Sequence, residues 1–181
     1  KLNEKGKLSK NAIAEGIINN IRKTIIREQL TDPRFYEQMS KLLEDLIARS
    51  RADAAAYEEF LRQAEALVKR LATKHSDGEV PAALHGKREA TVIYNNLPRI
   101  LAAGRAKAEV DGVVESREEF GNERLRLALE IDRVMRERAP AGWKGDQARE
   151  AQVLNALFPL LDRDREATAA LFELLKNQPG Y

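Results

Sequence analysis

The spacing of the apolar residues constrains the fold most, because they recur every three or four positions along most of the chain. Isoleucines stand four residues apart from position 13 to position 25, inside the segment from Asn11 to Gln29, and two more adjoin them at positions 18 and 26. This spacing predicts an amphipathic helix with Arg22, Lys23 and Arg27 outside the apolar stripe. Because β-branched residues lower helix propensity slightly, we expect this helix to depend on burial.

Two further helices are predicted in the N-terminal part. Thr31-Asp32-Pro33 predicts the end of the first helix and the start of the second, since Asp can cap a helix and Pro suits its first position. Whether the third helix begins near Ser50–Asp53 or the second runs on is left open. His75–Gly78 and Pro81 end the third helix. The two apolar stripes are Phe35, Met39, Leu42, Leu43, Leu46 and Ile47, then Tyr57, Phe60, Leu61, Ala64, Leu67, Val68 and Leu71.

The C-terminal part is also predicted to be helical. Ala90–Leu97 is interpreted as helix, Pro98 as a break, and Val110–Ser116 as a loop. A charge-rich helix follows, and then come a Pro- and Gly-containing connector, a helix capped by Asp146, and a last helix opened by Asp162 or Asp164. Their expected apolar faces are Leu127, Ile131 and Val134 or Met135 in the first, Ala148, Val153, Leu154, Leu157 and Phe158 in the second, and Leu171, Phe172, Leu174 and Leu175 in the third.

These patterns predict an all-α fold: a multi-helix, bundle-like domain of about seven to eight helices with little or no sheet. A length of 181 residues fits a single domain, residues 1–181, and a subdivision into a three-helix part at 1–76 and the remaining helices at 81–181 is the alternative. The chain begins with Lys rather than Met. We therefore expect a fragment of a longer protein, although trimming by a protease would look the same.

Composition excludes several classes of protein. Hydrophobic residues make up 43% and the net charge is only +2, which is atypical of a disordered chain. No apolar run approaches the roughly 20 residues of a membrane helix, and Lys1–Lys10 is too polar for a signal peptide. Cysteine is absent, which excludes disulfides and thiolate chemistry and fits a cytoplasmic location. The 31 basic and 29 acidic side chains nearly cancel, so composition alone predicts neither a nucleic-acid nor a membrane partner.

Motifs for catalysis are missing from the sequence. There is no Gly-rich phosphate-binding loop followed by Lys-Ser/Thr, no Glu-x-Lys step of metal-dependent nucleases, and no Gly-x-Ser-x-Gly elbow. His85 and Glu89 stand four apart, which on a helix could hold a metal, but no third ligand is evident. We therefore predict no catalytic, cofactor-binding or metal-binding residue in this chain.

Two groups of residues are candidates for contact with a partner. Residues 1–30 carry seven basic and three acidic side chains, a net charge of +4. A solvated face is the favoured interpretation, and contact of Arg22, Lys23 and Arg27 with DNA phosphates or an acidic partner is the alternative. Trp143, followed by Lys144, is the single Trp, and a core position is favoured over an exposed binding anchor.

Five short segments stand in a distinctive order along nearly the whole chain. They are Asn19-Asn20-Ile21-Arg22-Lys23 with Asp32-Pro33-Arg34-Phe35-Tyr36-Glu37-Gln38-Met39-Ser40 and Leu42-Leu43, then Tyr57-Glu58-Glu59-Phe60-Leu61, Ile93-Tyr94-Asn95-Asn96-Leu97, Gly142-Trp143-Lys144-Gly145, and Phe172-Glu173-Leu174-Leu175-Lys176-Asn177-Gln178 with Tyr181. Together they resemble the C-terminal helical region of the restriction (motor) subunit of type I restriction–modification enzymes. Residues 98–120 match nothing in that family and look like a variable insertion, and Pro179-Gly180 departs from the family's usual tail.

The resemblance implies a parent subunit with a nuclease domain, two motor domains that use ATP and magnesium to translocate DNA, and this helical domain at its end. The parent would be an ATP-dependent, type I site-specific deoxyribonuclease, whereas this fragment alone would be no enzyme and would hold no cofactor. Its implied partners are the methyltransferase and specificity subunits and its own motor domains. The expected function is an assembly module, and the alternatives are a basic surface that guides DNA to the motor and a purely structural brace.

Overall fold

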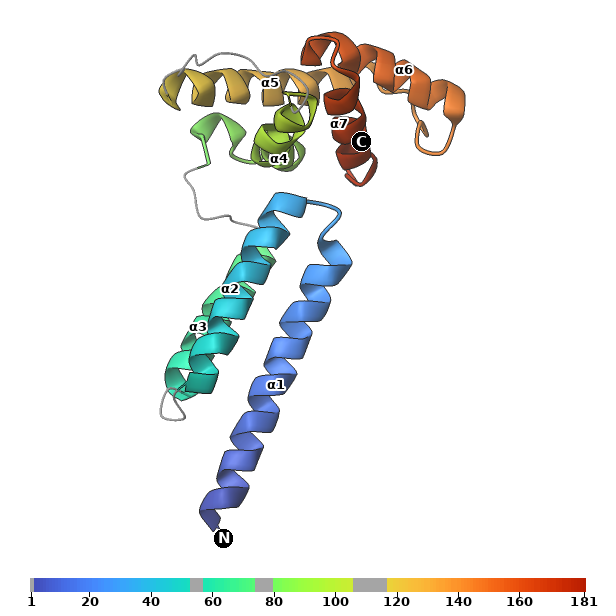
Figure 1. The fold of residues 1–181 in the computed structure, drawn as a ribbon. Helices are drawn as coiled ribbons and strands as arrows, with labels where there is room; N and C mark the ends of the chain where they lie inside the picture. Colours follow the sequence, from blue (N-terminus) through green and yellow to red (C-terminus); the bar gives the residue numbers. More distant parts are fainter. Residues whose placement is uncertain (1, 53–56, 74–79, 106–116) are drawn as a thin grey trace. The chain divides into compact units, whose positions relative to one another are not determined.

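The computed structural model describes residues 2–52, 57–73, 80–105 and 117–181. Within these ranges the fold is all-α, with seven α-helices, two short 3₁₀ helices and no strand, which confirms the predicted fold class (Figure 1). The chain forms two compact units, Lys1–Gly78 and Glu79–Tyr181. The boundary between them lies in the segment where Pro and Gly punctuate the sequence.

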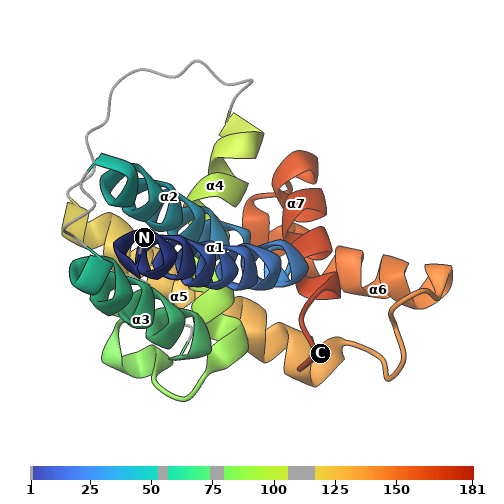
Figure 2. The same ribbon diagram turned by 90° about the horizontal axis from the view of Figure 1, so that it is seen from below.

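The first unit contains three consecutive helices, each antiparallel to the one before it: α1 (Leu2–Glu28), α2 (Pro33–Ala52) and α3 (Tyr57–Thr73) (Figure 1). Figure 2 looks roughly along their axes and shows α1 beside both α2 and α3. One apolar core joins them, and it consists of Ile21, Ile25, Phe35, Tyr36, Met39, Leu43, Leu46, Phe60, Ala64, Leu67 and Leu71. All of these core residues except Tyr36 come from the predicted stripes.

The corner between α1 and α2 is held by side chains that bond across it. The Phe35 amide donates to Asp32 Oδ1 at 3.3 Å, so Asp32 caps α2 as predicted. The Tyr36 hydroxyl donates to Glu28 Oε2 at 2.7 Å, and the Thr31 hydroxyl donates to the Glu28 carbonyl at 2.8 Å. Burial, followed by the bond to Glu28, raises the pKa of Tyr36 above its usual range. These bonds fix the end of α1 against the start of α2.

The second unit is built from α4 (Arg88–Arg105), α5 (Arg117–Arg138), α6 (Gln147–Leu157) and α7 (Arg165–Lys176), with 3₁₀ turns η2 (Ala82–Leu84) and η3 (Phe158–Leu161). Helix α4 packs against both α5 and α7, and α6 lies at one end of the unit against the same two helices (Figure 1). The centre of the core consists of Ile93, Leu97, Ala128, Ile131, Trp143, Val153, Leu157, Leu161, Leu171 and Leu175.

The sequence predicted that a helix would end at Pro98, and this prediction was wrong. Helix α4 runs through Pro98 to Arg105. A proline inside a helix removes one backbone hydrogen bond and crowds the preceding turn, at a cost of about 3 kcal/mol. Leu97 and Ile100 on either side of it are both buried in the core, so packing on both sides of Pro98 offsets this local cost.

Two aspartates open the last two α-helices. Asp146 Oδ1 accepts from the amides of Ala148 and Arg149 at 3.0 and 3.1 Å, which confirms the predicted cap. Asp164, not Asp162, caps α7 through two amides at 2.8 and 3.0 Å. Asp162 lies instead in the left-handed region, with φ of 52°, and ends η3.

Some sequence predictions fall outside the described residues or differ from them. The Val110–Ser116 loop, the His75–Gly78 stop and the middle of the 98–120 insertion lie outside the described ranges. Ile13 and Val68 were expected on apolar faces but are about half exposed, and Ala148 is exposed as well. None of the described helices combines the length and the apolar character needed to cross a bilayer.

The core position of Leu171 gives a direct test of the packing of the second unit. Leu171→Ala should lower the free energy of unfolding by about 2–5 kcal/mol, because a fully buried side chain leaves a cavity. Urea unfolding followed by the fluorescence of Trp143, the single Trp of the chain, measures this loss.

Leu154→Ala is the matched control, because Leu154 is only partly buried in the same unit. It should cost clearly less than Leu171→Ala. Equal losses in the two variants would contradict the core described here.

Candidate functional site

The three predicted contact cations lie on the exposed side of α1. Arg22 and Lys23 are exposed, and the Arg27 side chain is 73% exposed. Arg27 Nη2 stands 3.1 Å from Glu28 Oε1, a surface ion pair that contributes little to stability. Arg22 and Lys23 are therefore available to a partner, whereas Arg27 is shared with Glu28.

Two large apolar side chains lie among these cations, and this exposed apolar surface was not predicted from the sequence. Ile26 is 59% exposed, and Leu30, which follows the end of α1, is 61% exposed. Arg22 and Lys23 stand four and three residues before Ile26, so they are its neighbours on the helix surface. We call Arg22, Lys23, Ile26, Arg27 and Leu30 the α1 outer face.

Helix geometry explains why Ile26 is outside although it adjoins the apolar stripe. Position 26 is five residues after the buried Ile21, which rotates it by about 140° around the axis. Placing each isoleucine separately by its rotation around the helix axis would have shown from the sequence that Ile26 lies outside the buried stripe. Ile25, one residue earlier, is 5% exposed and belongs to the core.

The α1 outer face carries a net positive charge, because Arg22 and Lys23 add to an Arg27 that is paired with Glu28. Between positions 16 and 31 the only acidic residue is Glu28. Glu28 accepts the Tyr36 hydroxyl at 2.7 Å and pairs with Arg27. Three exposed cations thus surround two exposed aliphatic side chains with no exposed carboxylate between positions 16 and 31.

Trp143 and Lys144, the other predicted contacts, lie in the second unit. Trp143 is 2% exposed and its ring centroid is 5.5 Å from that of Phe172, so the favoured core interpretation is confirmed. Burial lowers the pKa of Lys144, whose ammonium donates to the Gln178 carbonyl. Lys144 thereby holds the C-terminal segment and is not a free surface cation.

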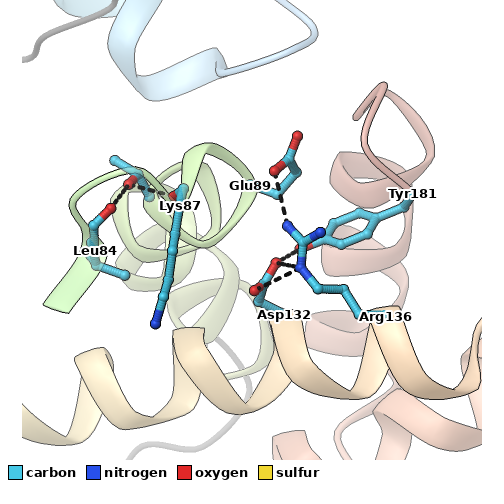
Figure 3. A network of polar contacts seen from close by, with 7 residues as sticks. Leu84, Lys87, Glu89, Asp132, Arg136 and Tyr181 are labelled. Atoms are coloured by element: carbon cyan, nitrogen blue, oxygen red, sulfur yellow. Dashed lines mark hydrogen bonds and ion pairs between the residues drawn. The ribbon is translucent and has the colours of Figure 1, made fainter.

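A second polar cluster joins residues far apart in the sequence (Figure 3). Arg136 Nε bonds both oxygens of Asp132 at 3.1 and 3.2 Å, and its Nη2 reaches Glu89 Oε2 at 3.1 Å. The Tyr181 hydroxyl donates to Asp132, which is only 7% exposed. The i,i+4 pair of Asp132 and Arg136 is visible in the sequence, whereas the approach of Glu89 and Tyr181 needs the fold. We call these four residues the C-terminal clasp.

The clasp satisfies its own charges and shows no reactive arrangement. Arg136 neutralises part of the charge of two carboxylates. Its hydrogen bond to Asp132 and the negative charge of Asp132 raise the pKa of the Arg136 guanidinium. Burial first, and then the bond to Asp132, raises the pKa of Tyr181 above its usual range. A hydroxyl held in its protonated form against an ion pair fastens the chain end and is a poor nucleophile.

The metal arrangement considered for His85 and Glu89 does not form. His85 precedes α4 and follows η2, so the two residues do not share a helical face. Glu89 binds Arg136 instead. Among the described residues, no three His, Cys, Asp or Glu side chains gather closely enough to hold a metal ion.

Comparison of the chain with protein-family models, with curated proteins and with solved structures finds no match. The resemblance to the restriction subunit therefore remains a prediction from the sequence.

The clasp predicts how stability depends on alkaline pH. The pKa of Tyr181 is higher in the folded state than in the unfolded chain, so its contribution is complete below about pH 10 and is lost as the pH rises above that value. The free energy of unfolding, followed by Trp143 fluorescence in urea at a series of pH values, should fall above this pH. Tyr181→Phe should be less stable at neutral pH by about 1–3 kcal/mol and should show a shallower alkaline fall.

Asp132→Asn provides the comparison, because it keeps the shape of the acceptor and removes its charge. It should also make the alkaline fall shallower, since the carboxylate is part of the cause of the raised pKa of Tyr181. A Tyr181→Phe profile parallel to that of the wild type would contradict the clasp.

Proposed function

We propose that this chain is a non-catalytic, helical assembly module of the restriction subunit of a type I restriction enzyme, acting in the cytoplasm. It would couple the ATP-dependent DNA translocase and endonuclease to the methyltransferase–specificity core. The observation that supports a docking role is the α1 outer face, where Ile26 and Leu30 are exposed among three cations. The ordered sequence resemblance supports the choice of partner.

Exposed aliphatic side chains favour a protein partner over DNA. Contacts to DNA phosphates come from Arg, Lys, small polar side chains and backbone amides. Ile26 and Leu30 gain nothing from a phosphate, but burying them against an apolar partner contributes about 25 cal/mol for each Å² removed from water. Apolar residues within a charged rim are typical of protein interfaces.

Direct DNA contact is the second candidate, and the net positive charge of the α1 outer face favours it. Arg22, Lys23 and Arg27 lie within two turns of one helix, and no exposed carboxylate lies between positions 16 and 31. Such a surface would attract a duplex and release counterions, so that affinity would fall steeply with salt. In that role the face would guide DNA towards the motor domains.

The catalytic functions belong, in this proposal, to other parts of the parent subunit. ATP and magnesium would be bound by its motor domains, and this chain would contribute none of the ligands. Its partners would be the methyltransferase and specificity subunits, with the motor domains of the same subunit alongside.

Binding to the purified methyltransferase–specificity complex tests the proposal. The chain should bind this complex without DNA, and affinity should fall only modestly as salt rises, because rim charges set register and association rate more than affinity. Arg22→Glu combined with Lys23→Glu should weaken binding by roughly tenfold or more, as like charges replace complementary ones. Pull-down and fluorescence anisotropy at several salt concentrations provide the measurement.

Lys41→Glu combined with Lys69→Glu is the matched control, since both lysines are exposed on other helices of the same unit. It should leave binding unchanged. Failure to bind the complex, together with salt-sensitive binding to duplex alone, would favour DNA guidance and overturn the assembly role.

A further inference from the structure

We propose that the α1 outer face receives an amphipathic helix of the partner, one that presents carboxylates on both sides of a short apolar row. This inference rests on the proposed assembly function and deepens it by specifying the chemistry of the docking segment. Four observations on the face lead to it: the exposure of its apolar residues, its fixed position, its charge, and the contrast with the other exposed isoleucine of α1.

The two exposed apolar side chains lie at the C-terminal end of α1. Ile26 is in the last turn of the helix, Leu30 is in the turn that directly follows it, and both are more than half exposed. Side chains three or four residues apart on an incoming helix form a ridge that could pack over this pair. A partner helix with apolar residues at i, i+4 and i+7 would cover both side chains.

The face is held in place before any partner arrives. Ile21 and Ile25, on the opposite side of the same turns, are 3% and 5% exposed and belong to the core of the unit. The Tyr36–Glu28 and Asp32–Phe35 hydrogen bonds fix the corner where α1 ends. A rigid surface loses little conformational entropy on binding, which raises affinity for a helix of matching shape.

The positive charge of the α1 outer face favours a partner helix with negative charge. Arg22 and Lys23 lie one turn before Ile26, and Arg27 follows it directly. Glu28, the only carboxylate between positions 16 and 31, is engaged by Tyr36 and Arg27. Carboxylates on the flanks of the incoming helix would pair with these cations. A second copy of this chain docking through the same face would oppose cations to cations, so self-association here is disfavoured.

Ile13 shows that exposure alone does not make this site. It is 51% exposed on the same helix, thirteen residues before Ile26. The helical rotation places it about 140° around the axis and about 20 Å along it. Ile13 is therefore a matched control of the same residue type, helix and exposure, outside the α1 outer face.

Synthetic helical peptides test the proposal without assuming the identity of the partner. Three labelled peptides of about five turns are compared: Leu at i, i+4 and i+7 flanked by Glu, the same row flanked by Lys, and the Glu peptide with its Leu residues replaced by Ser. Titration with the whole chain, followed by fluorescence anisotropy, should show binding of the first peptide only. Ile26→Ser combined with Leu30→Ser should weaken it by roughly tenfold or more, and Ile13→Ser should leave it unchanged.

Several results would overturn the proposal. One is that the acidic apolar peptide does not bind, and another is that the basic peptide binds equally well. A third is an unchanged affinity in the Ile26→Ser, Leu30→Ser variant. The last is that a DNA duplex at low salt displaces the peptide to the same extent whether or not Ile26 is substituted. Circular dichroism of each variant establishes that α1 remains folded, which is expected because the substituted side chains are exposed.

The outcomes also separate this inference from the proposed function. Binding of the acidic peptide without binding of the methyltransferase–specificity complex would support the face and refute the restriction assignment. Binding of the complex that is unaffected by Ile26→Ser and Leu30→Ser would support the assembly function and refute this face.

Discussion

The burial of one stripe of α1 against α2 and α3 is the interaction on which the account of the first unit depends. Ile21 and Ile25 enter the core with Phe35 and Met39, and this determines which side of α1 faces water. The opposite side then presents Ile26 between basic residues. Since a helix is rigid about its own axis, the orientation of the exposed face follows directly from the core. Function in this unit would thus be a consequence of packing rather than of a separate motif.

The second unit uses polar contacts to fix the end of the chain. Lys144 donates to the Gln178 carbonyl, and the Tyr181 hydroxyl donates to Asp132. Gly180 lies against the Glu89 carboxylate so closely that a β-carbon there would clash with it. Together these contacts hold the segment after α7 on the surface of α4 and α5, next to the apolar core. Lys144, Asp132 and Tyr181 are thereby engaged in holding this segment.

Local signals in the sequence predicted most of the helices, because hydrophobic period and capping chemistry act within a few residues. The restart at Asp32-Pro33 and the cap at Asp146 followed from such signals and are confirmed. Pro98 was misjudged because the burial of Leu97 and Ile100, which is a tertiary effect, outweighs a local preference. The clasp could not be predicted, since Tyr181 and Asp132 are 49 residues apart. Ile26 was within reach of helix geometry but was grouped with its buried neighbours.

Chemical footprinting of Lys23 tests the central claim most directly. Lysine acetylation is measured by mass spectrometry for the free chain and for the chain mixed with the methyltransferase–specificity complex, and Lys41, whose side chain is 71% exposed on α2, serves as an internal reference. The account predicts that Lys23 becomes strongly protected in the mixture while Lys41 reacts as before. Equal reactivity of Lys23 in the free and bound chain would contradict docking through α1.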